Sequence, residues 1–364
     1  MKIVDNISAK QLIINLSILL SKPTGIGNYA QNLFPYLKSL QPTLLVAQKY
    51  PNFDCYPIPS NLTPDHGTKG HLNRLIWTQF KLPKISKELK SSLLFSPLPE
   101  APLYTDCRFI VTSFDMIPLR FAKPFSPLTP YHRYYTPQVL KQAQHIICIS
   151  QTTAKDITDF YGIPASKITA IPLAHDRTHF LPLNLPTSNY FLYIGRQDPY
   201  KNIQRLISAF AALPNCKDYE LWLVGPVDSR YTPTLKVQVA ELGVTNQVKF
   251  LDYVPYSELP KIINQAIALV FPSLWEGFGL PVLEAMACGT PVITSNLSSL
   301  PEVAGDAAIL INPYNTEEIT EAMQAVATNS VLRSRLSSQG ITHSQQFSWE
   351  KTGKATAEVL SRYL

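Results

Sequence analysis

The sequence predicts an α/β protein with two doubly wound domains, each built on a parallel sheet. Apolar segments of strand length alternate with helical patterns along the chain, which is the βαβ order of parallel sheets. This alternation occurs twice, with a polar, proline-containing break at residues 173–189 between the two series. The chain has 364 residues, too many for one ordinary core and suited to two domains of about 150–200 residues.

The first series covers the N-terminal half of the chain. Strands are expected at residues 11–19, 93–97, 108–114 and 145–150, and helices at 28–40 and 153–162. The longest apolar run, Leu12–Leu20, is too short to cross a membrane. A loop-like segment follows it rather than a small-residue cleavage site, so a buried first strand is expected instead of a signal peptide.

The second series begins after the break. Strands are expected at residues 190–195, 220–225, 248–253, 266–273 and 291–295, and helices at 202–213, 257–266 and 281–289. A capped amphipathic helix follows Ser348 at the end of the chain. The predicted domains are therefore residues 1–174 and 175–346, with a final segment 347–364 that packs back on the first domain.

Composition narrows the class of protein. Hydrophobic residues make up 45% of the chain and charged residues 16%, as in a well-cored globular protein. The net charge of +6 is dispersed, without zinc-finger spacing or a basic-aromatic RNA signature, so nucleic acid is not an expected partner. The five cysteines are scattered and form neither a C-x-x-C pair nor a metal-ligand pattern, which favours the cytoplasm.

The segment FPSLWEGFGLPVLEAMACGTPVITS holds the first candidate site. Glu276 lies in a loop after a predicted strand, with Gly277 and Gly279 beside it, and Pro281 suits the first turn of the next helix. The N-terminus of that helix favours an anion such as a diphosphate. Glu284, one turn into the helix, leans back toward the same place. Carboxylates accept hydrogen bonds from vicinal hydroxyls, so one glutamate suits a ribose and the other a second sugar.

A second loop follows the strand that ends at Gly195. Arg196 and Lys201 lie in this loop, and Asn202 is expected to cap the helix that follows. Two fixed cations after a strand suit a diphosphate, because they stabilise the negative charge of its phosphate groups.

Residues 275–295 closely resemble the E-x7-E segment of the retaining family 4 glycosyltransferases, which have the GT-B fold. Residues 24–37, 145–176 and 193–210 are similar to further segments of that family, in the same order. The resemblance covers nearly the whole chain. It implies a retaining transferase that moves a sugar from a nucleotide-diphosphate donor to a hydroxyl acceptor on a glycan or lipid.

The resemblance also assigns roles. Residues 1–174 become the acceptor side and 175–346 the nucleotide-sugar side. GDP-mannose is the first expectation for the donor, which is a substrate, so no cofactor is implied. No D-x-D motif occurs, and no metal is expected. The implied catalytic residues are Arg196, Lys201, Glu276 and Asp115. The implied donor-binding residues are Gly25, Gly27, Gly195, Gly225, Val254, Gly277, Phe278, Gly279, Leu280 and Glu284.

One departure from the family keeps other interpretations open. Many relatives have His-Asp where this chain has Phe114 and Asp115. Asp115 either binds sugar hydroxyls or is an ordinary loop aspartate. Two other functions remain: a nucleotide-sugar epimerase of the same architecture, and a sugar-nucleotide-binding protein without catalysis.

The segment 78–92 is basic and amphipathic. Lysines at 81, 84, 87 and 90 stand beside Phe80, Leu82, Ile85 and Leu89. This pattern fits either a helix lying on anionic lipid, which would place the protein at the inner face of the membrane, or a solvated surface.

Overall fold

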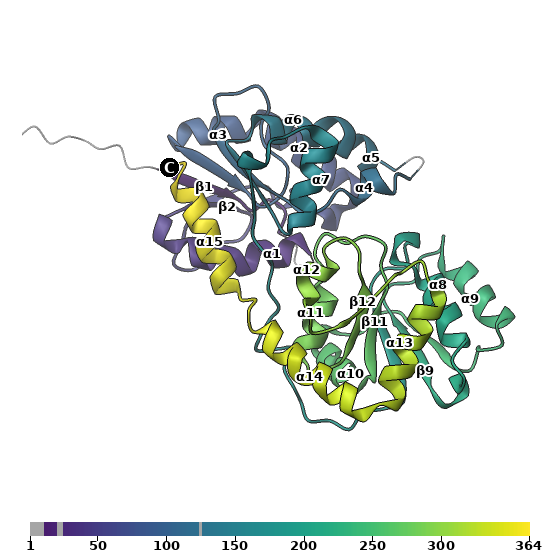
Figure 1. Ribbon diagram of the computed structural model, residues 1–364. Helices are drawn as coiled ribbons and strands as arrows, with labels where there is room; N and C mark the ends of the chain where they lie inside the picture. Colours follow the sequence, from purple (N-terminus) through teal and green to yellow (C-terminus); the bar gives the residue numbers. More distant parts are fainter. Residues whose placement is uncertain (1–10, 20–24, 124–125) are drawn as a thin grey trace, which may run out of the picture. The chain divides into compact units, whose positions relative to one another are not determined.

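The computed structural model describes residues 11–19, 25–123 and 126–364. The chain divides into two compact units. Unit 1 comprises Met1–Pro172 together with Trp349–Leu364, and unit 2 comprises Leu173–Ser348. Each unit has one parallel sheet with helices on both of its faces (Figure 1). The predicted α/β fold with two doubly wound sheets is confirmed.

Within the described residues, the sheet of unit 1 has seven strands in the order β3-β2-β1-β4-β5-β6-β7, all parallel. Its strands are β1 Leu12–Asn15, β2 Thr43–Val46, β3 Asp54–Pro57, β4 Leu93–Ser96, β5 Phe109–Ser113, β6 His145–Cys148 and β7 Ile168–Ala170. Its helices are α1 Ile26–Leu33, α2 Gly67–Phe80, α3 Leu82–Glu88, α4 Ile117–Arg120, α5 Leu128–Pro130, α6 Thr136–Gln142, α7 Gln151–Tyr161 and α15 Trp349–Ser361.

Local sequence explains where several of these elements begin and end. The Ser150 hydroxyl accepts a hydrogen bond from the Thr153 amide at 3.0 Å and starts α7, and Gly162 ends it in the left-handed region. Strand β1 is shorter than the predicted 11–19. The predicted helix 28–40 is α1 followed by a 3₁₀ helix, η1 (Phe34–Leu40), because Pro35 interrupts the α-helical hydrogen bonds.

The described part of unit 2 has six parallel strands in the order β10-β9-β8-β11-β12-β13. The strands are β8 Tyr190–Ile194, β9 Glu220–Val224, β10 Val248–Leu251, β11 Ala268–Phe271, β12 Val292–Ser295 and β13 Ile309–Ile311. The helices are α8 Ile203–Ala211, α9 Thr232–Glu241, α10 Leu259–Gln265, α11 Leu280–Ala287, α12 Leu300–Ala304, α13 Thr316–Thr328 and α14 Ser330–Ser344.

Helix α15 belongs to unit 1, where it packs on η1. A Cβ atom at Gly353 would lie 2.3 Å from the Tyr36 Cβ, so only glycine permits this close approach. Trp349 lies 6.3 Å from Tyr29, measured between ring centroids. The last helix thus completes the core of the unit that also contains the start of the chain.

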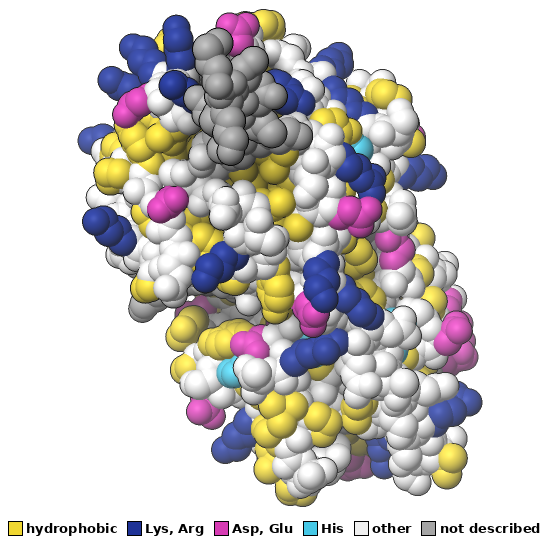
Figure 2. Space-filling view, turned by 90° about the vertical axis from the view of Figure 1, so that its left-hand side faces the viewer, with side chains coloured by type: hydrophobic (Ala, Val, Ile, Leu, Met, Phe, Trp, Pro, Cys, Tyr) yellow, Lys and Arg dark blue, Asp and Glu magenta, His cyan; other side chains and the backbone are white. Residues whose placement is uncertain are grey.

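The basic segment 78–92, which fitted either a helix on lipid or a solvated surface, covers the end of α2 and helix α3, and the apolar side of α3 faces inward. Leu82 and Ile85 are buried in the core of unit 1 and cannot face a membrane. The exposed apolar residues lie earlier, on α2, at Leu72, Ile76 and Phe80. Figure 2 shows Lys and Arg side chains gathered among hydrophobic ones in the upper part of the view.

Candidate functional site

The central pair of strands in unit 2 marks a binding position. Strands β8 and β11 are neighbours, but the chain continues from β8 to β9 on one side and from β11 to β12 on the other. Such a reversal leaves a crevice at the carboxyl ends of the two strands, where ligands bind in open parallel sheets. The loops 195–202 and 272–279 lead out of these two ends.

A salt bridge joins these loops. The Lys201 Nζ lies 2.6 Å from the Glu276 Oε1, and both side chains are almost buried, at 12% and 10% exposed. Lys201 also lies over the rings of Tyr200 and Phe271. The Leu274 amide donates to the Tyr200 carbonyl at 2.7 Å and holds the loop backbones together. Two residues implicated from separate segments of the sequence are therefore in direct contact.

Arg196 is placed differently from Lys201. Its guanidinium lies 3.0 Å from the Asp198 carboxylate, and its side chain is 64% exposed. The backbone around it is fixed, since the buried Tyr193 hydroxyl donates to the Arg196 carbonyl at 2.7 Å. Burial raises the pKa of Tyr193, so the hydroxyl stays protonated and keeps donating. Arg196 is thus a cation on a rigid backbone with a side chain able to move.

The predicted capping role of Asn202 is wrong. Asn202 stands just before α8 but adopts the left-handed conformation, with φ 62°, and its side chain does not cap the helix. Its amide donates instead to the carbonyls of Pro272 and Pro313, at 3.1 and 2.7 Å. Asn202 therefore ties the Lys201 loop to the Glu276 loop, a long-range role that a local capping rule does not anticipate.

Two serines missed by the sequence analysis hold the Glu276 loop. The Ser298 hydroxyl accepts from the Glu276 amide at 3.0 Å. The fully buried Ser299 hydroxyl lies 3.0 Å from the Glu276 carbonyl and 2.8 Å from the Phe278 carbonyl, to which it donates. The run SNLSS after a predicted strand was the available signal, but serines in a loop rarely reveal their partners.

Helix α11 begins at this loop as predicted, with Pro281 in its first turn and Gly289 just beyond its end. Gly279 has φ 113°, and a Cβ atom there would lie 2.7 Å from Leu300. No side chain caps the N-terminus of this helix. Gly277 and Phe278 are buried in the loop, and Leu280, the first helical residue, is half-buried.

Glu284 lies on α11 and is half-buried. Surrounding protein atoms remove water from the carboxylate, and this desolvation raises the pKa of Glu284 to about 7. Among the described residues, none forms an ion pair or hydrogen bond with this carboxylate. A carboxylate in such surroundings is stabilised when a ligand donates hydrogen bonds to it.

Gly195 and Gly225 end β8 and β9 side by side. Gly225 has φ 148°, and a Cβ atom there would lie 2.0 Å from the Gly195 carbonyl oxygen. Gly225 therefore permits close contact between two backbones. Val254, also among the implied donor-binding residues, is half-buried in the loop after β10.

Gly25, Gly27 and Asp115 lie in unit 1. Gly25 precedes α1 with φ 49°, and Gly27 is buried in the first turn of that helix. Residues 20–24 of the predicted glycine loop lie outside the described residues. Asp115 follows β5 and accepts a hydrogen bond from the Ile117 amide at 3.0 Å, the loop-aspartate geometry that remained open. The Phe114 ring stands edge-on to Tyr29 at 5.2 Å.

Unit 1 has its own strand reversal, between β1 and β4. A pocket of about 360 Å³ with polar and apolar walls lies at the carboxyl ends of β1, β2 and β3, away from β4. Ser17 lines this pocket, and its hydroxyl is buried without a hydrogen-bond partner in the described structure. Gln31 of α1 and the segment Thr63, Asp65, His66 contribute further polar groups.

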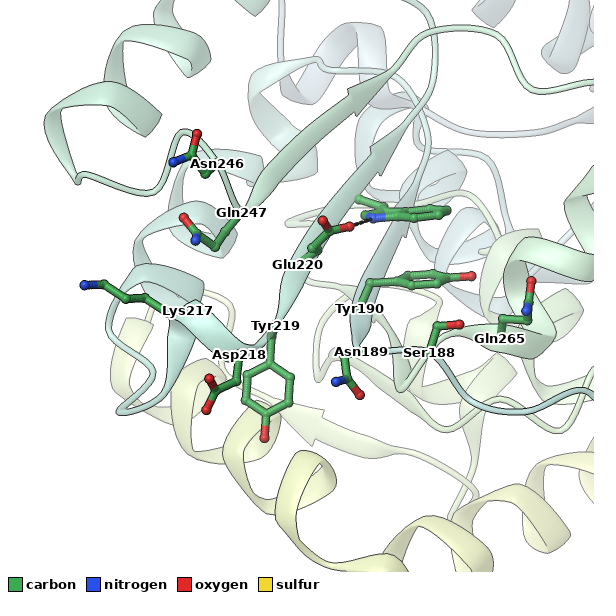
Figure 3. A pocket seen from close by; sticks show the side chains of 11 residues that line it. Ser188, Asn189, Tyr190, Lys217, Asp218, Tyr219, Glu220, Asn246, Gln247 and Gln265 are labelled. Atoms are coloured by element: carbon green, nitrogen blue, oxygen red, sulfur yellow. Dashed lines mark hydrogen bonds between the residues drawn. The ribbon is translucent and has the colours of Figure 1, made fainter.

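A pocket of about 410 Å³ occurs at the opposite edge of the sheet of unit 2 (Figure 3). Its residues precede or begin β8, β9 and β10, so they lie at the amino ends of the strands. The rings of Tyr190 and Trp222 stack at 3.9 Å, and the Trp222 indole donates to Glu220 at 2.6 Å. The Tyr190, Trp222 and Glu220 side chains thus interact with one another, and none of the predicted site residues lines this pocket.

No group of three or more potential metal ligands occurs in the part of the chain that the structure describes. Among the described helices, none combines the length and hydropathy needed to cross a membrane.

Comparison with family models covers most of the chain. Residues 176–343 match the model described as glycosyl transferases group 1, and residues 23–179 match the model of glycosyltransferase family 4. The two matches together run from residue 23 to residue 343.

Two relatives with similar sequences are named mannosyltransferases. The chain is 32% identical to the O-antigen chain mannosyltransferase B of Escherichia coli, over 62% of this chain and 61% of that protein. It thus spans less than two thirds of that relative. It is 26% identical to the O-antigen chain mannosyltransferase RfbU of Salmonella typhimurium, over 86% and 90%. The structure of Anabaena Alr3699/HepE in complex with UDP and glucose superposes with a TM-score of 0.74 at 18% identity, over 97% and 100%. That likeness shows a shared fold.

Proposed function

The chain belongs to the group 1 glycosyltransferases and has their GT-B fold, and from this premise we propose that it transfers a sugar from a nucleotide diphosphate to a hydroxyl acceptor with retention of anomeric configuration. The salt bridge between Lys201 and Glu276 carries the proposal. It puts a cation and a carboxylate together at the strand reversal of unit 2. There the cation would bind the negatively charged diphosphate of the donor, and the carboxylate would bind the hydroxyls of its sugar.

The proposed reaction breaks the bond between the anomeric carbon and the donor phosphate. A new bond forms between that carbon and the acceptor oxygen, and the acceptor proton passes to the leaving diphosphate. Negative charge grows on the diphosphate as it leaves. Lys201, the mobile side chain of Arg196 and the uncapped N-terminus of α11 would stabilise that charge.

The two glutamates have different proposed roles. Glu284, whose carboxylate is desolvated on α11, would accept hydrogen bonds from the ribose. Glu276 would bind the hydroxyls of the transferred sugar, while Lys201 turns from Glu276 toward the diphosphate. Gly277, Phe278, Gly279 and Leu280 would bring backbone amides to the donor. Val254 and Gly225 would lie toward the base, and Gly195 toward the phosphates.

GDP-mannose is the proposed donor, because the relatives aligned above are named mannosyltransferases. The proposed acceptor is a glycan or a lipid-linked glycan. The pocket of unit 1 would take a sugar of the acceptor, since the unpartnered Ser17 hydroxyl and polar groups beside apolar walls suit a carbohydrate. Gly25, Gly27 and Asp115 belong to the same unit and would act on this side of the reaction.

No cofactor is proposed, because the donor is a substrate, and the two cations would replace a metal ion at the diphosphate. The cytoplasm is the proposed location. The five cysteines are scattered along the chain and form no C-x-x-C pair, as expected in a reducing compartment.

The decisive experiment is a thermal-shift screen of UDP-, GDP-, ADP- and dTDP-sugars, followed by a transfer assay with the donor that stabilises most. A ligand at 100 times its Kd stabilises the folded state by about 2.7 kcal/mol. Glu284→Gln should weaken binding of the free nucleotide diphosphate, whereas Glu276→Gln should spare that binding and impair transfer. Lys217→Gln, at the opposite edge of the sheet, is the matched control and should change neither.

Absence of stabilisation by every nucleotide sugar would contradict the proposal. A donor that binds without being transferred to any of a broad panel of acceptors would instead support a binding protein.

A further inference from the structure

Helix α2 carries a stripe of exposed apolar side chains on unit 1. Leu72, Ile76 and Phe80 are 56%, 50% and 67% exposed. They are spaced four residues apart, so they lie along one face of the helix. Single exposed apolar residues are ordinary on protein surfaces, but a contiguous row of three large ones marks an interaction surface.

The other face of α2 is held firmly in the unit. Arg74 is buried and makes two hydrogen bonds to the Glu100 carboxylate, at 2.7 and 2.8 Å. Trp77 is buried in the core, and Gly70 lies so close to the Thr63 carbonyl that a Cβ atom would be 2.0 Å from it. The stripe is therefore presented in a fixed orientation, and the core of unit 1 is complete without it.

Lysines surround the stripe. Five exposed lysines occur between residues 67 and 90, against one acidic residue, Glu88. Lys69 lies on the same face of α2 as the stripe, and Lys81 and Lys84 follow Phe80 directly; Lys87 and Lys90 complete the set. Lysine is depleted in interfaces between proteins, whereas its long stem and terminal charge suit the surface of an anionic membrane.

The position of α2 along the chain adds a second argument, which rests on the proposed function. The residues just before α2, Thr63, Asp65 and His66, line the pocket of unit 1 proposed for the acceptor. A helix lying on the membrane would therefore hold that pocket next to the bilayer surface, where a lipid-linked acceptor presents its sugar.

We propose that α2 and the five lysines, which we call the α2 surface, bind an anionic lipid bilayer. Leu72, Ile76 and Phe80 enter the boundary between headgroups and acyl chains, and the lysines contact the anionic headgroups. Bound in this way, the protein is a peripheral membrane enzyme that meets a lipid-linked acceptor at the cytoplasmic face of the bilayer.

Vesicle flotation tests this proposal without any assay of activity. Vesicles of phosphatidylcholine with 30% phosphatidylglycerol should bind the full chain, and vesicles of phosphatidylcholine alone should bind it far less. Because a lysine at an anionic surface contributes about fivefold to partitioning, the double variant Lys81→Gln, Lys84→Gln should bind about 30-fold more weakly. Leu72→Ser with Phe80→Ser should reduce binding at least about tenfold, even on fully anionic vesicles.

Matched controls come from unit 2. Val331 is 78% exposed, and Lys217 and Lys261 are exposed. Val331→Ser with Lys217→Gln and Lys261→Gln should bind vesicles as the natural chain does. Equal binding to neutral and anionic vesicles, or undiminished binding by the α2 variants, would overturn the proposal. So would concentration-dependent dimerisation that Phe80→Ser abolishes, since a second copy would then occupy the stripe.

The two proposals fail separately. If vesicles do not bind but sugar is transferred to a soluble acceptor, the membrane proposal fails and the enzymatic one stands. If vesicles bind but no nucleotide sugar does, the enzymatic proposal fails while the α2 surface keeps its lipid partner.

Discussion

At the scale of single residues, Lys201 has the strongest structural argument. Its ammonium is almost buried, paired with Glu276 and fixed over two rings. Lys201→Ala should lower kcat by at least about 10²-fold, the usual effect of losing one preorganised charged donor. Steady-state kinetics with the preferred donor measure this. Arg196→Ala should also lower kcat, because the mobile guanidinium would follow the diphosphate as its charge grows.

The control for Lys201 must separate charge from folding, because removing it leaves Glu276 without its cation. Lys201→Ala combined with Glu276→Gln should recover much of any lost thermal stability but none of the turnover. Near-native turnover in Lys201→Ala would show that the cation has no role at the diphosphate.

The raised pKa of Glu284 predicts that the stability of the protein depends on pH. Burial raises its pKa from the ordinary 4.5 to about 7, so the folded protein holds a proton that the unfolded chain releases between those values. The stability of the empty protein should therefore fall as pH rises from about 4.5 to 7. Glu284→Gln should remove this decline and be more stable than the natural chain at pH 8. It should also bind nucleotide diphosphate at least about tenfold more weakly.

Unfolding midpoints at pH 5 and pH 8, with calorimetry of nucleotide binding, test both parts. An identical pH dependence in the variant and the natural chain would show that another group titrates. Tighter nucleotide binding by the variant would contradict the ribose role.

The sequence placed Lys201 and Glu276 in loops that directly follow strands, and the structure has both residues there, at the strand ends where ligands bind in open parallel sheets. The contact between Lys201 and Glu276 required the strand order, in which β8 and β11 are neighbours. Asn202 was misassigned because a capping rule considers only the next helix, while its partners are 70 and 111 residues away.

At the scale of elements, the loop 272–279 depends on the segment after β12. Ser299→Ala would remove the hydrogen bonds that the Ser299 hydroxyl donates to the Glu276 and Phe278 carbonyls. This change should destabilise the protein by about 1–3 kcal/mol and lower kcat more than it raises KM, because Glu276 would lose its position. Denaturant unfolding and kinetics measure the two effects. The exposed Ser257→Ala is the matched control, and an active, fully stable Ser299→Ala would refute the dependence.

Helices and strands were predicted correctly where the spacing of apolar residues was regular. They were missed or misjudged where contacts with distant residues determine the structure. In unit 2, strands β8 to β12 are short apolar runs and were predicted, whereas the edge strand β13 was not. Helices α13 and α14 were not predicted, although Asn315 and Asn329 cap their first turns. The apolar face of the basic segment was misjudged, because Leu82 and Ile85 pack into the core of unit 1 and leave the exposed stripe to α2.

At the scale of the whole molecule, the proposed chemistry relies on cations that the chain itself supplies. Sugar transfer should therefore proceed at full rate in excess EDTA. The measurement is turnover before and after exhaustive chelation, with a glycosyltransferase known to need manganese assayed alongside. Activity that disappears with EDTA and returns with magnesium or manganese would require a metal at the diphosphate.

The two-domain architecture followed from the sequence, because two βαβ series separated by a polar break leave few other folds. The sequence analysis also expected the final segment to pack back on the first domain, and in the structure α15 belongs to unit 1 and packs on η1 and α1. The contact that lets the helix approach so closely, between Gly353 and Tyr36, could not be predicted, because it joins residues far apart in the sequence.

Because α15 belongs to unit 1, the two units are completed in a fixed order while the chain is synthesised on the ribosome. Unit 2 can close once Ser348 has emerged, whereas unit 1, begun first, still waits for α15. At about 5–20 residues per second, the wait between Pro172 and Trp349 is on the order of ten to thirty seconds. During that time the surface around Tyr29 and Tyr36 stays uncovered and open to chaperones. A chain that ends just before Trp349 would therefore have a complete unit 2 attached to a unit 1 that lacks α15.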